Sequence, residues 1–231
     1  EDTVMPVVPM FHANAWGIPY AAALSGSRLV LPGPRMAPAD LAELIAAERV
    51  THSAGVPTVW QGIAHLEDPP DPSSLEEIMA GGSAVPESLI RTFDERFGVP
   101  IMQGWGMTET SPLAATSRVP TGVDPASDEA YRIRAAQGRP LPLVETRIDA
   151  STGGELLIRG PWVAQAYYAD DEGADKFTPD GWLRTGDVAE LLDGHVIKLV
   201  DRTKDLVKSG GEWISSVELE NAIMAHPEVA E

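Results

Sequence analysis

The alternation of short apolar runs with longer helical patterns in the first part of the chain constrains the fold more than any other feature. Short apolar runs typical of buried strands occur at residues 4–8, 27–31, 52–56 and 75–79. Helical patterns follow them, the first ending near residue 24 and the others spanning 38–49, 58–66 and 86–97. This order predicts an α/β architecture, in which a parallel sheet is layered with helices, and we place this subdomain at residues 1–140.

The pattern changes in the second part of the chain. Residues 118–139 are polar and lack periodicity, so we expect an irregular surface excursion there. Short alternating runs then occur at 144–148, 155–159, 188–192 and 195–200, and an Asp-Gly pair at 193–194 signals a hairpin between the last two. These runs predict a smaller antiparallel β subdomain at residues 141–200.

Charge and cysteine content exclude several classes of protein. The 231 residues include 17 Lys and Arg against 35 Asp and Glu, and the net charge of −18 would repel nucleic acid and anionic lipid. The absence of cysteine excludes disulfides, thiol catalysis and zinc–thiolate sites. No apolar run reaches the ~20 residues that span a bilayer, and we expect a cytoplasmic protein. Because the chain begins at Glu1 and ends at Glu231, we interpret it as a piece of a longer protein.

The richest chemistry lies in the stretch Gln-Gly-Trp-Gly-Met-Thr-Glu-Thr-Ser, which begins at Gln103. Its two glycines would let a ligand approach the backbone, and Trp105 between them offers a flat face for a planar ring. Thr108 supplies a hydroxyl, and Glu109 supplies a hard oxygen ligand suited to Mg²⁺. Taken alone, the stretch is equally consistent with a glycine turn before a helix or strand.

A second glycine sequence, Gly81-Gly82-Ser83, comes at the end of an expected strand. Ligands bind at the carboxyl ends of strands in open α/β sheets, so the glycines would again permit close backbone approach. The lysine-containing pattern of a mononucleotide P-loop is absent. A tight turn that enters a helix at Pro86 is the structural alternative, and it is compatible with binding.

Three further groups of residues have both a functional and a structural interpretation. Asp187 follows Thr-Gly, and its two carboxylate oxygens could accept hydrogen bonds from a vicinal diol, although taken alone the residue fits a β-turn aspartate better. Arg202, Lys204 and Lys208 could neutralise a polyanion or form a solvated basic turn. A lone histidine such as His12 is more often structural than catalytic.

Five motifs, in order along nearly the whole chain, resemble those of the adenylate-forming superfamily, which includes acyl-CoA synthetases, luciferases and peptide-synthetase adenylation domains. They are Pro-Met-Phe-His-x-x-x-Trp from residue 9, Gly-Gly-Ser-Ala-x-Pro from 81, Trp-Gly-x-Thr-Glu from 105, Thr-Gly-Asp from 185 and Asp-Arg-x-Lys-Asp from 201. The string Lys-Ser-Gly-Gly-Glu-Trp-Ile-Ser, from residue 208, is typical of medium- and long-chain fatty acyl-CoA synthetases.

The resemblance implies a role for each candidate residue. It implies that the nucleotide is contacted by Gly81, Gly82, Ser83, Gln103, Gly104, Trp105, Gly106, Thr108, Asp187, Arg202, Lys204, Lys208 and Trp213. Within this set Trp105 lies against adenine, Asp187 and Arg202 hold the ribose, Thr108 and Lys208 help neutralise phosphate charge, and Glu109 holds Mg²⁺. It further implies that His12 and Trp16 line the acyl pocket, with Trp16 as its gate, and that Gly210 and Gly211 lie near the pantetheine route. The alternative for Trp16 is a core aromatic.

By this resemblance the parent protein activates a fatty acid with Mg-ATP to an acyl adenylate and transfers the acyl group to coenzyme A. Residues 201–231 would form a hinge at Lys204 and the beginning of a small C-terminal α+β domain, with a helix at 216–225. The family's phosphate loop and C-terminal lysine are absent, so we expect this fragment to be inactive. An aryl-CoA ligase of the coumarate type and a non-catalytic nucleotide- or acyl-binding protein are the alternatives, and a homodimer of the full-length protein stays open.

Overall fold

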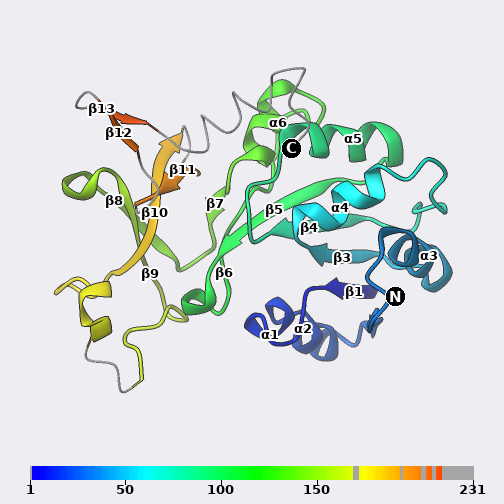
Figure 1. Ribbon diagram of the computed structural model, residues 1–231, viewed down its shortest axis with the longest axis horizontal. Helices are drawn as coiled ribbons and strands as arrows, with labels where there is room; N and C mark the ends of the chain where they lie inside the picture. The colour runs from blue at the N-terminus through cyan, green and yellow to red at the C-terminus, as the bar shows by residue number, and fades with distance from the viewer. Residues whose placement is uncertain (1, 169–171, 193–194, 204–206, 210–211, 215–231) are drawn as a thin grey trace. The chain divides into compact units, whose positions relative to one another are not determined.

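The computed structural model describes residues 2–168, 172–192, 195–203, 207–209 and 212–214 (Figure 1). The chain divides into two compact units, Glu1–Leu141 and Pro142–Glu231, which we call the N-terminal and the C-terminal unit. The helix predicted at residues 216–225, and with it most of the predicted C-terminal domain, lies outside the described residues. No helix in the described ranges is long and apolar enough to cross a membrane.

The N-terminal unit is built on a seven-stranded sheet with the strand order β2-β1-β3-β4-β5-β6-β7. The strands are β1 (Thr3–Val7), β2 (Arg28–Leu29), β3 (His52–Gly55), β4 (Glu77–Gly81), β5 (Ile101–Gly106), β6 (Leu113–Thr116) and β7 (Arg139–Pro140). All pairs among β1 to β5 are parallel, whereas β6 pairs antiparallel with β5 and with β7. The predicted α/β architecture is confirmed, and one edge is antiparallel because the short link from β5 to β6 cannot make a crossover.

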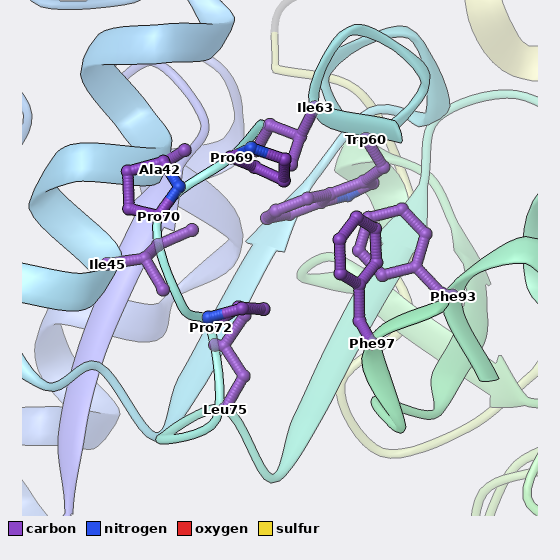
Figure 2. Close-up of a pocket in the computed structure, with 10 residues that line it drawn as sticks. All are labelled: Ala42, Ile45, Trp60, Ile63, Pro69, Pro70, Pro72, Leu75, Phe93 and Phe97. Carbon is purple, nitrogen blue, oxygen red and sulfur yellow. The ribbon is translucent and has the colours of Figure 1, made fainter. Parts of the chain in front are cut away.

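This unit also contains helices (Figure 1), and those that follow the first two pack on the sheet through one apolar cluster. The helices are α1 (Ala13–Trp16), α2 (Ile18–Ser25), α3 (Pro38–Glu48), α4 (Pro57–Ala64), α5 (Glu87–Phe97) and α6 (Asp128–Ala135). Trp60 of α4 meets Phe93 of α5 edge to face, with ring centroids 6.3 Å apart. Figure 2 shows these rings facing Pro69, Pro70 and Pro72 around a cavity of about 10 Å³. That volume holds one water molecule at most, so the cavity is not a ligand site.

Helix α6 corrects the expectation that residues 118–139 are irregular throughout. The hydroxyl of Ser127 caps the helix by accepting a hydrogen bond from the Ala130 N–H at 3.1 Å. Arg134 is only 5% exposed, and it donates to the carboxylate of Asp94 and to the Ile101 carbonyl of β5. The helix therefore buries a charged side chain instead of an apolar stripe, and a search for hydrophobic periodicity misses it.

The C-terminal unit contains a four-stranded antiparallel sheet with the order β11-β10-β9-β8, which confirms the predicted β subdomain. Its strands are β8 (Glu145–Asp149), β9 (Glu155–Arg159), β10 (Leu183–Leu192) and β11 (Val196–Arg202). The turn signal at 193–194 lies outside the described residues, but Leu192 and Val196 on either side of it are paired. Strands β12 (Val207–Ser209) and β13 (Glu212–Ile214) form a separate antiparallel pair.

Candidate functional site

The carboxyl ends of the parallel strands bring three of the predicted motifs to one edge of the N-terminal sheet. His12 and Trp16 follow β1, Gly82 and Ser83 follow β4, and Thr108 follows β5. Because β1, β3, β4 and β5 run in the same direction, these segments leave the sheet on the same side. This edge is where open α/β sheets bind ligands.

The glycine turn, residues 81–86, lies directly against the tryptophan motif of β5. Gly81 and Gly104 are register partners, and a Cβ on Gly81 would lie 2.6 Å from the Gly104 carbonyl oxygen. The same Cβ would lie 3.5 Å from Cη2 of the Trp16 indole. Trp16 therefore packs beside the turn that is predicted to contact the nucleotide, and a larger residue than glycine at position 81 would displace one of these neighbours.

Trp16 is carried by a left-handed backbone turn. Four consecutive residues without glycine, Ala13 to Trp16, have φ values between 44° and 55°, and Gly17 continues the turn at 72°. Each such residue costs about 1–2 kcal/mol relative to a right-handed conformation. Strained backbone of this kind is concentrated at functional sites, so the turn supports the interpretation that Trp16 has a role beyond packing.

The side chain of Gln103 is hydrogen-bonded to the glycine turn. Gln103 is 1% exposed, and its side-chain Oε1 accepts a hydrogen bond from the Val85 N–H at 2.9 Å. The Gln103 N–H donates in turn to the Ser117 hydroxyl at 2.7 Å. The contact of Gln103 with the nucleotide stays a prediction, whereas its side-chain oxygen is hydrogen-bonded to the backbone of the glycine turn. Ser117, which lies 14 residues further along the chain, carries no sequence signal for this role.

A closed loop at residues 106–112, the Thr-Glu loop, presents Thr108 and Glu109. The Met107 N–H donates to the Pro112 carbonyl at 3.0 Å and to the Thr110 hydroxyl at 2.9 Å. A methyl group at Gly106 would collide with the Pro112 carbonyl oxygen, so this position requires glycine. Thr110 is fully buried, whereas Thr108 is exposed and Glu109 half-buried. Thr110 was not among the predicted site residues, although its hydroxyl directly after the Thr-Glu pair was the available signal.

The loop fits Mg²⁺ only if other ligands complete the coordination. Glu109 offers one carboxylate and Thr108 one hydroxyl, and no group of three or more acidic or histidine side chains that could hold a metal occurs among the described residues. Mg²⁺ is commonly held by one or two carboxylates together with water and substrate phosphates. A single carboxylate beside the glycine turn therefore suits a nucleotide-bound Mg²⁺.

Trp105 is 8% exposed, so only a small part of its ring is accessible.

In the C-terminal unit, Asp187 and Arg202 are register partners on β10 and β11. Arg202 Nε lies 3.8 Å from Asp187 Oδ1, and the side chains are 63% and 18% exposed, respectively. The backbone before Asp187 forms a bulge in the pairing of β10 with β9. Arg184 pairs with Leu157 and Val188 pairs with Glu155, so residues 185–187 of β10 lie opposite a single residue of β9. We call residues 185–187 the Thr-Gly-Asp bulge.

Several predicted residues can be described only in part. Lys204, Gly210 and Gly211 lie outside the described residues. Lys208 and Trp213 are register partners in β12 and β13, and their side chains are likewise outside the description. An open hollow of about 390 Å³ in the C-terminal unit is lined by Arg159, Gly160, Val163, Ala164, Gln165 and Gly181, none of which was predicted as a site residue.

The fold occurs in solved structures of CoA synthetases. One such structure, O-succinylbenzoate coenzyme A synthetase from Bacillus subtilis in complex with ATP and a magnesium ion, is similar to this chain with a TM-score of 0.83 and 28% identity. The similarity covers 100% of this chain and 48% of that one.

The family model for AMP-binding enzymes matches residues 1–168, and the chain belongs to this family. Among curated relatives, a long-chain-fatty-acid–CoA ligase of Thermus thermophilus is 47% identical, with 100% of this chain and 45% of the relative covered. A medium-chain-fatty-acid–CoA ligase of Ectopseudomonas oleovorans is 45% identical over 100% of this chain and 44% of its own length. The chain thus spans less than half of the relatives that it matches.

Proposed function

We propose that this chain is part of an AMP-forming acyl-CoA synthetase that activates a fatty acid with Mg-ATP and transfers the acyl group to coenzyme A. The observation that carries the proposal is the packing of Trp16 against the glycine turn, since it puts the predicted acyl residue beside the predicted nucleotide residues. Family membership and the names of the two relatives support the same conclusion.

In the proposed first step, a carboxylate oxygen of the fatty acid attacks the α-phosphorus of ATP, and pyrophosphate leaves with the bond electrons. Phosphoryl transfer of this kind needs positioning and neutralisation of charge more than covalent help from the protein. The exposed hydroxyl of Thr108 donates to a phosphate oxygen, and Lys208 adds a positive charge. Glu109 would hold Mg²⁺, which supplies further neutralisation of the phosphates.

The rest of the nucleotide is recognised by shape and by hydrogen bonds. We propose that the backbone of Gly81, Gly82 and Ser83 and the accessible part of Trp105 contact adenine. The carboxylate of Asp187 accepts hydrogen bonds from both ribose hydroxyls, and Arg202 is oriented beside it by their ion pair. In the second step the thiol of coenzyme A attacks the acyl carbonyl and AMP leaves, after rotation about Lys204, with Gly210 and Gly211 along the pantetheine route and Trp213 near the nucleotide.

The acid is proposed to be aliphatic rather than aromatic. Both relatives are named for fatty acids, and Trp16 is half-buried at the sheet edge, where it can line an acyl pocket together with His12. The coumarate-type alternative shares the nucleotide chemistry but has no specific observation in its favour. Cytoplasmic location and assembly into a homodimer are further proposals, to be checked by cell fractionation and by light scattering.

The experiment is a measurement of CoA-ester formation by the native protein that carries this sequence, with acids graded from butyrate to palmitate and with cinnamate as the aryl competitor. We expect kcat/KM to be highest for an aliphatic acid, and Glu109→Gln to reduce the rate at every Mg²⁺ concentration. Glu129→Gln, a change at an exposed position of α6, serves as the control. A preference for cinnamate would contradict the proposed acid, and no CoA ester from any acid would contradict the activity.

A further inference from the structure

The Thr-Gly-Asp bulge needs hydrogen-bond partners other than the backbone of β9, because its own backbone leaves the ladder with that strand. Residues 185–187 of β10 face a single residue of β9, so their N–H groups cannot all be paired by that strand. Unpaired polar groups of the backbone cost free energy when they are shielded from water. Something other than β9 backbone must therefore hold this part of the strand in one conformation.

A buried carboxylate and a hydroxyl supply the missing partners. Glu155, the first residue of β9, accepts a hydrogen bond on Oε1 from the Gly186 N–H at 3.1 Å. The hydroxyl of Thr185 accepts one from the Asp187 N–H at 3.1 Å and donates to the Leu156 carbonyl at 2.7 Å. The N–H groups of Gly186 and Asp187 are thus each hydrogen-bonded to a side chain.

Glu155 is itself held by a cation. Its Oε2 accepts a hydrogen bond from Arg184 Nη1 at 2.9 Å, and its side chain is only 9% exposed. The same guanidinium group reaches Asp149 Oδ2 at 3.4 Å. A buried carboxylate with one oxygen on a backbone N–H and the other on an arginine is fixed in direction, which is the property that a positioning residue needs.

On the other side of β10, the bulge is tied to the strand that carries Arg202. The Thr203 N–H donates to the Gly186 carbonyl at 2.9 Å, and Gly186 has the positive φ of 76° that this geometry requires. Gly186 is therefore held through its N–H by Glu155 and through its carbonyl by Thr203. Its neighbour Asp187 then projects its carboxylate towards Arg202.

We propose that Glu155 is a positioning residue for nucleotide recognition, which holds the Thr-Gly-Asp bulge so that the Asp187 carboxylate can accept both ribose hydroxyls. The inference rests on the proposed function, because it takes Asp187 as the ribose ligand. It assigns to Glu155, the first residue of β9, a specific part in discrimination between nucleotides.

The test compares the binding of AMP and of 2′-deoxy-AMP to the native protein that carries this sequence, by calorimetry. Loss of one hydrogen bond to a charged group corresponds to about a tenfold change in affinity. We therefore expect wild type to prefer AMP by about tenfold and Asp187→Asn to lose this preference. Glu155→Gln keeps the size of the side chain but turns an amide donor towards Arg184, so it should lose most of the preference as well. Glu145→Gln, which breaks an exposed ion pair with Arg159 on the same sheet, should keep it.

The ratio of the two affinities separates positioning from a general structural effect. A variant that is merely destabilised weakens both nucleotides equally and leaves the ratio unchanged, which would overturn the inference. If Glu155→Gln does not fold, Thr185→Val and Thr185→Ser provide a second pair: the first removes the hydroxyl under Asp187 and should lose the preference, and the second should retain it. Equal preference in both would overturn the inference. Absence of AMP preference in wild type would instead overturn the ribose role of Asp187, and the inference with it.

Discussion

The two units hold their candidate ligand-binding residues by different physical means. In the N-terminal unit the glycine turn and the Thr-Glu loop are fixed by backbone shape and by neutral hydrogen bonds, such as those of Gln103 and Thr110. In the C-terminal unit the Thr-Gly-Asp bulge depends on the charges of Glu155 and Arg184. The first arrangement is sensitive to added volume and to lost neutral partners, whereas the second is sensitive to charge.

The chemistry of the proposed ligand accounts for the difference. A planar base is recognised by close approach, so its site needs rigid backbone and small residues. A ribose diol is recognised by a carboxylate, and a carboxylate beside other charges needs a fixed direction to be selective. The pKa of the Arg184 guanidinium is raised, chiefly by its hydrogen bond to Glu155, which agrees with the direct ion pair between the two side chains.

The largest effect is expected where added volume meets backbone. Gly106→Ala would drive a methyl group into the Pro112 carbonyl, and we expect the free energy of unfolding to fall by about 3 kcal/mol. Gly122→Ala is the control, since that position has open space and only a positive φ, and it should cost about 1 kcal/mol. Urea unfolding measures both, and equal losses would contradict the steric account.

The next effect concerns a neutral hydrogen bond. Gln103→Leu leaves the buried N–H of Val85 without its acceptor, and we expect a loss of about 2 kcal/mol that does not change with salt. Hydrogen exchange at the Val85 amide should accelerate more than at other amides of the sheet. Gln61→Leu, at a half-buried position of α4, should change stability by no more than about 0.5 kcal/mol. A salt-dependent loss for Gln103→Leu would remove the contrast between the units.

The left-handed turn before Trp16 predicts a gain in stability from glycine. Ala13→Gly relieves a φ of 44° and should raise the free energy of unfolding by about 1 kcal/mol. The same substitution at Ala21, an exposed position in the right-handed helix α2, should lower it by about 1 kcal/mol. Thermal unfolding of the two variants compares the signs, and a loss at both positions would show that the turn carries no strain.

The smallest effect is a pH dependence in the C-terminal unit. The pKa of Asp180 is lowered from 3.8 to about 2, first by its hydrogen bond from Arg147 and then by one from Thr178. Because the folded-state pKa is the lower one, the stabilisation is present above pH 3.8 and is lost as the pH falls towards 2. The difference in Tm between wild type and Asp180→Asn should shrink over this range. A difference that stays constant would contradict the assignment.

Much of the fold could be predicted because its signals are local. The strands β1 to β4 coincide with the predicted apolar runs, and each helix from α2 to α5 follows its strand close to the predicted range, whereas β5, which contains two glycines, was not predicted. Helix α6 was missed because it buries Arg134 and Tyr131 in place of an aliphatic stripe. The N-cap Ser127, the acidic first turn and the arginines at the end of the helix were the signals that could have located it.

The candidate site was predictable as a set of motifs but not as a set of contacts. The motifs single out Gly81 and Gly104, yet they show neither that these residues pair across β4 and β5 nor that the Gln103 side chain reaches Val85, 18 residues away. Likewise the Thr-Gly-Asp sequence does not reveal that β10 bulges there or that Glu155, 31 residues earlier than Gly186, supplies the acceptor. Such contacts depend on register between strands, which the residues of one strand do not determine.

The central claim is the proposed binding of a nucleotide by the turns described above, and backbone amide NMR during a titration with AMP tests it most directly. We predict chemical-shift changes at Gly81, Gly82 and Gly104 in the N-terminal unit and at Gly186 and Asp187 in the C-terminal unit. No change at these amides, or a response only around the hollow beside Arg159, would contradict it.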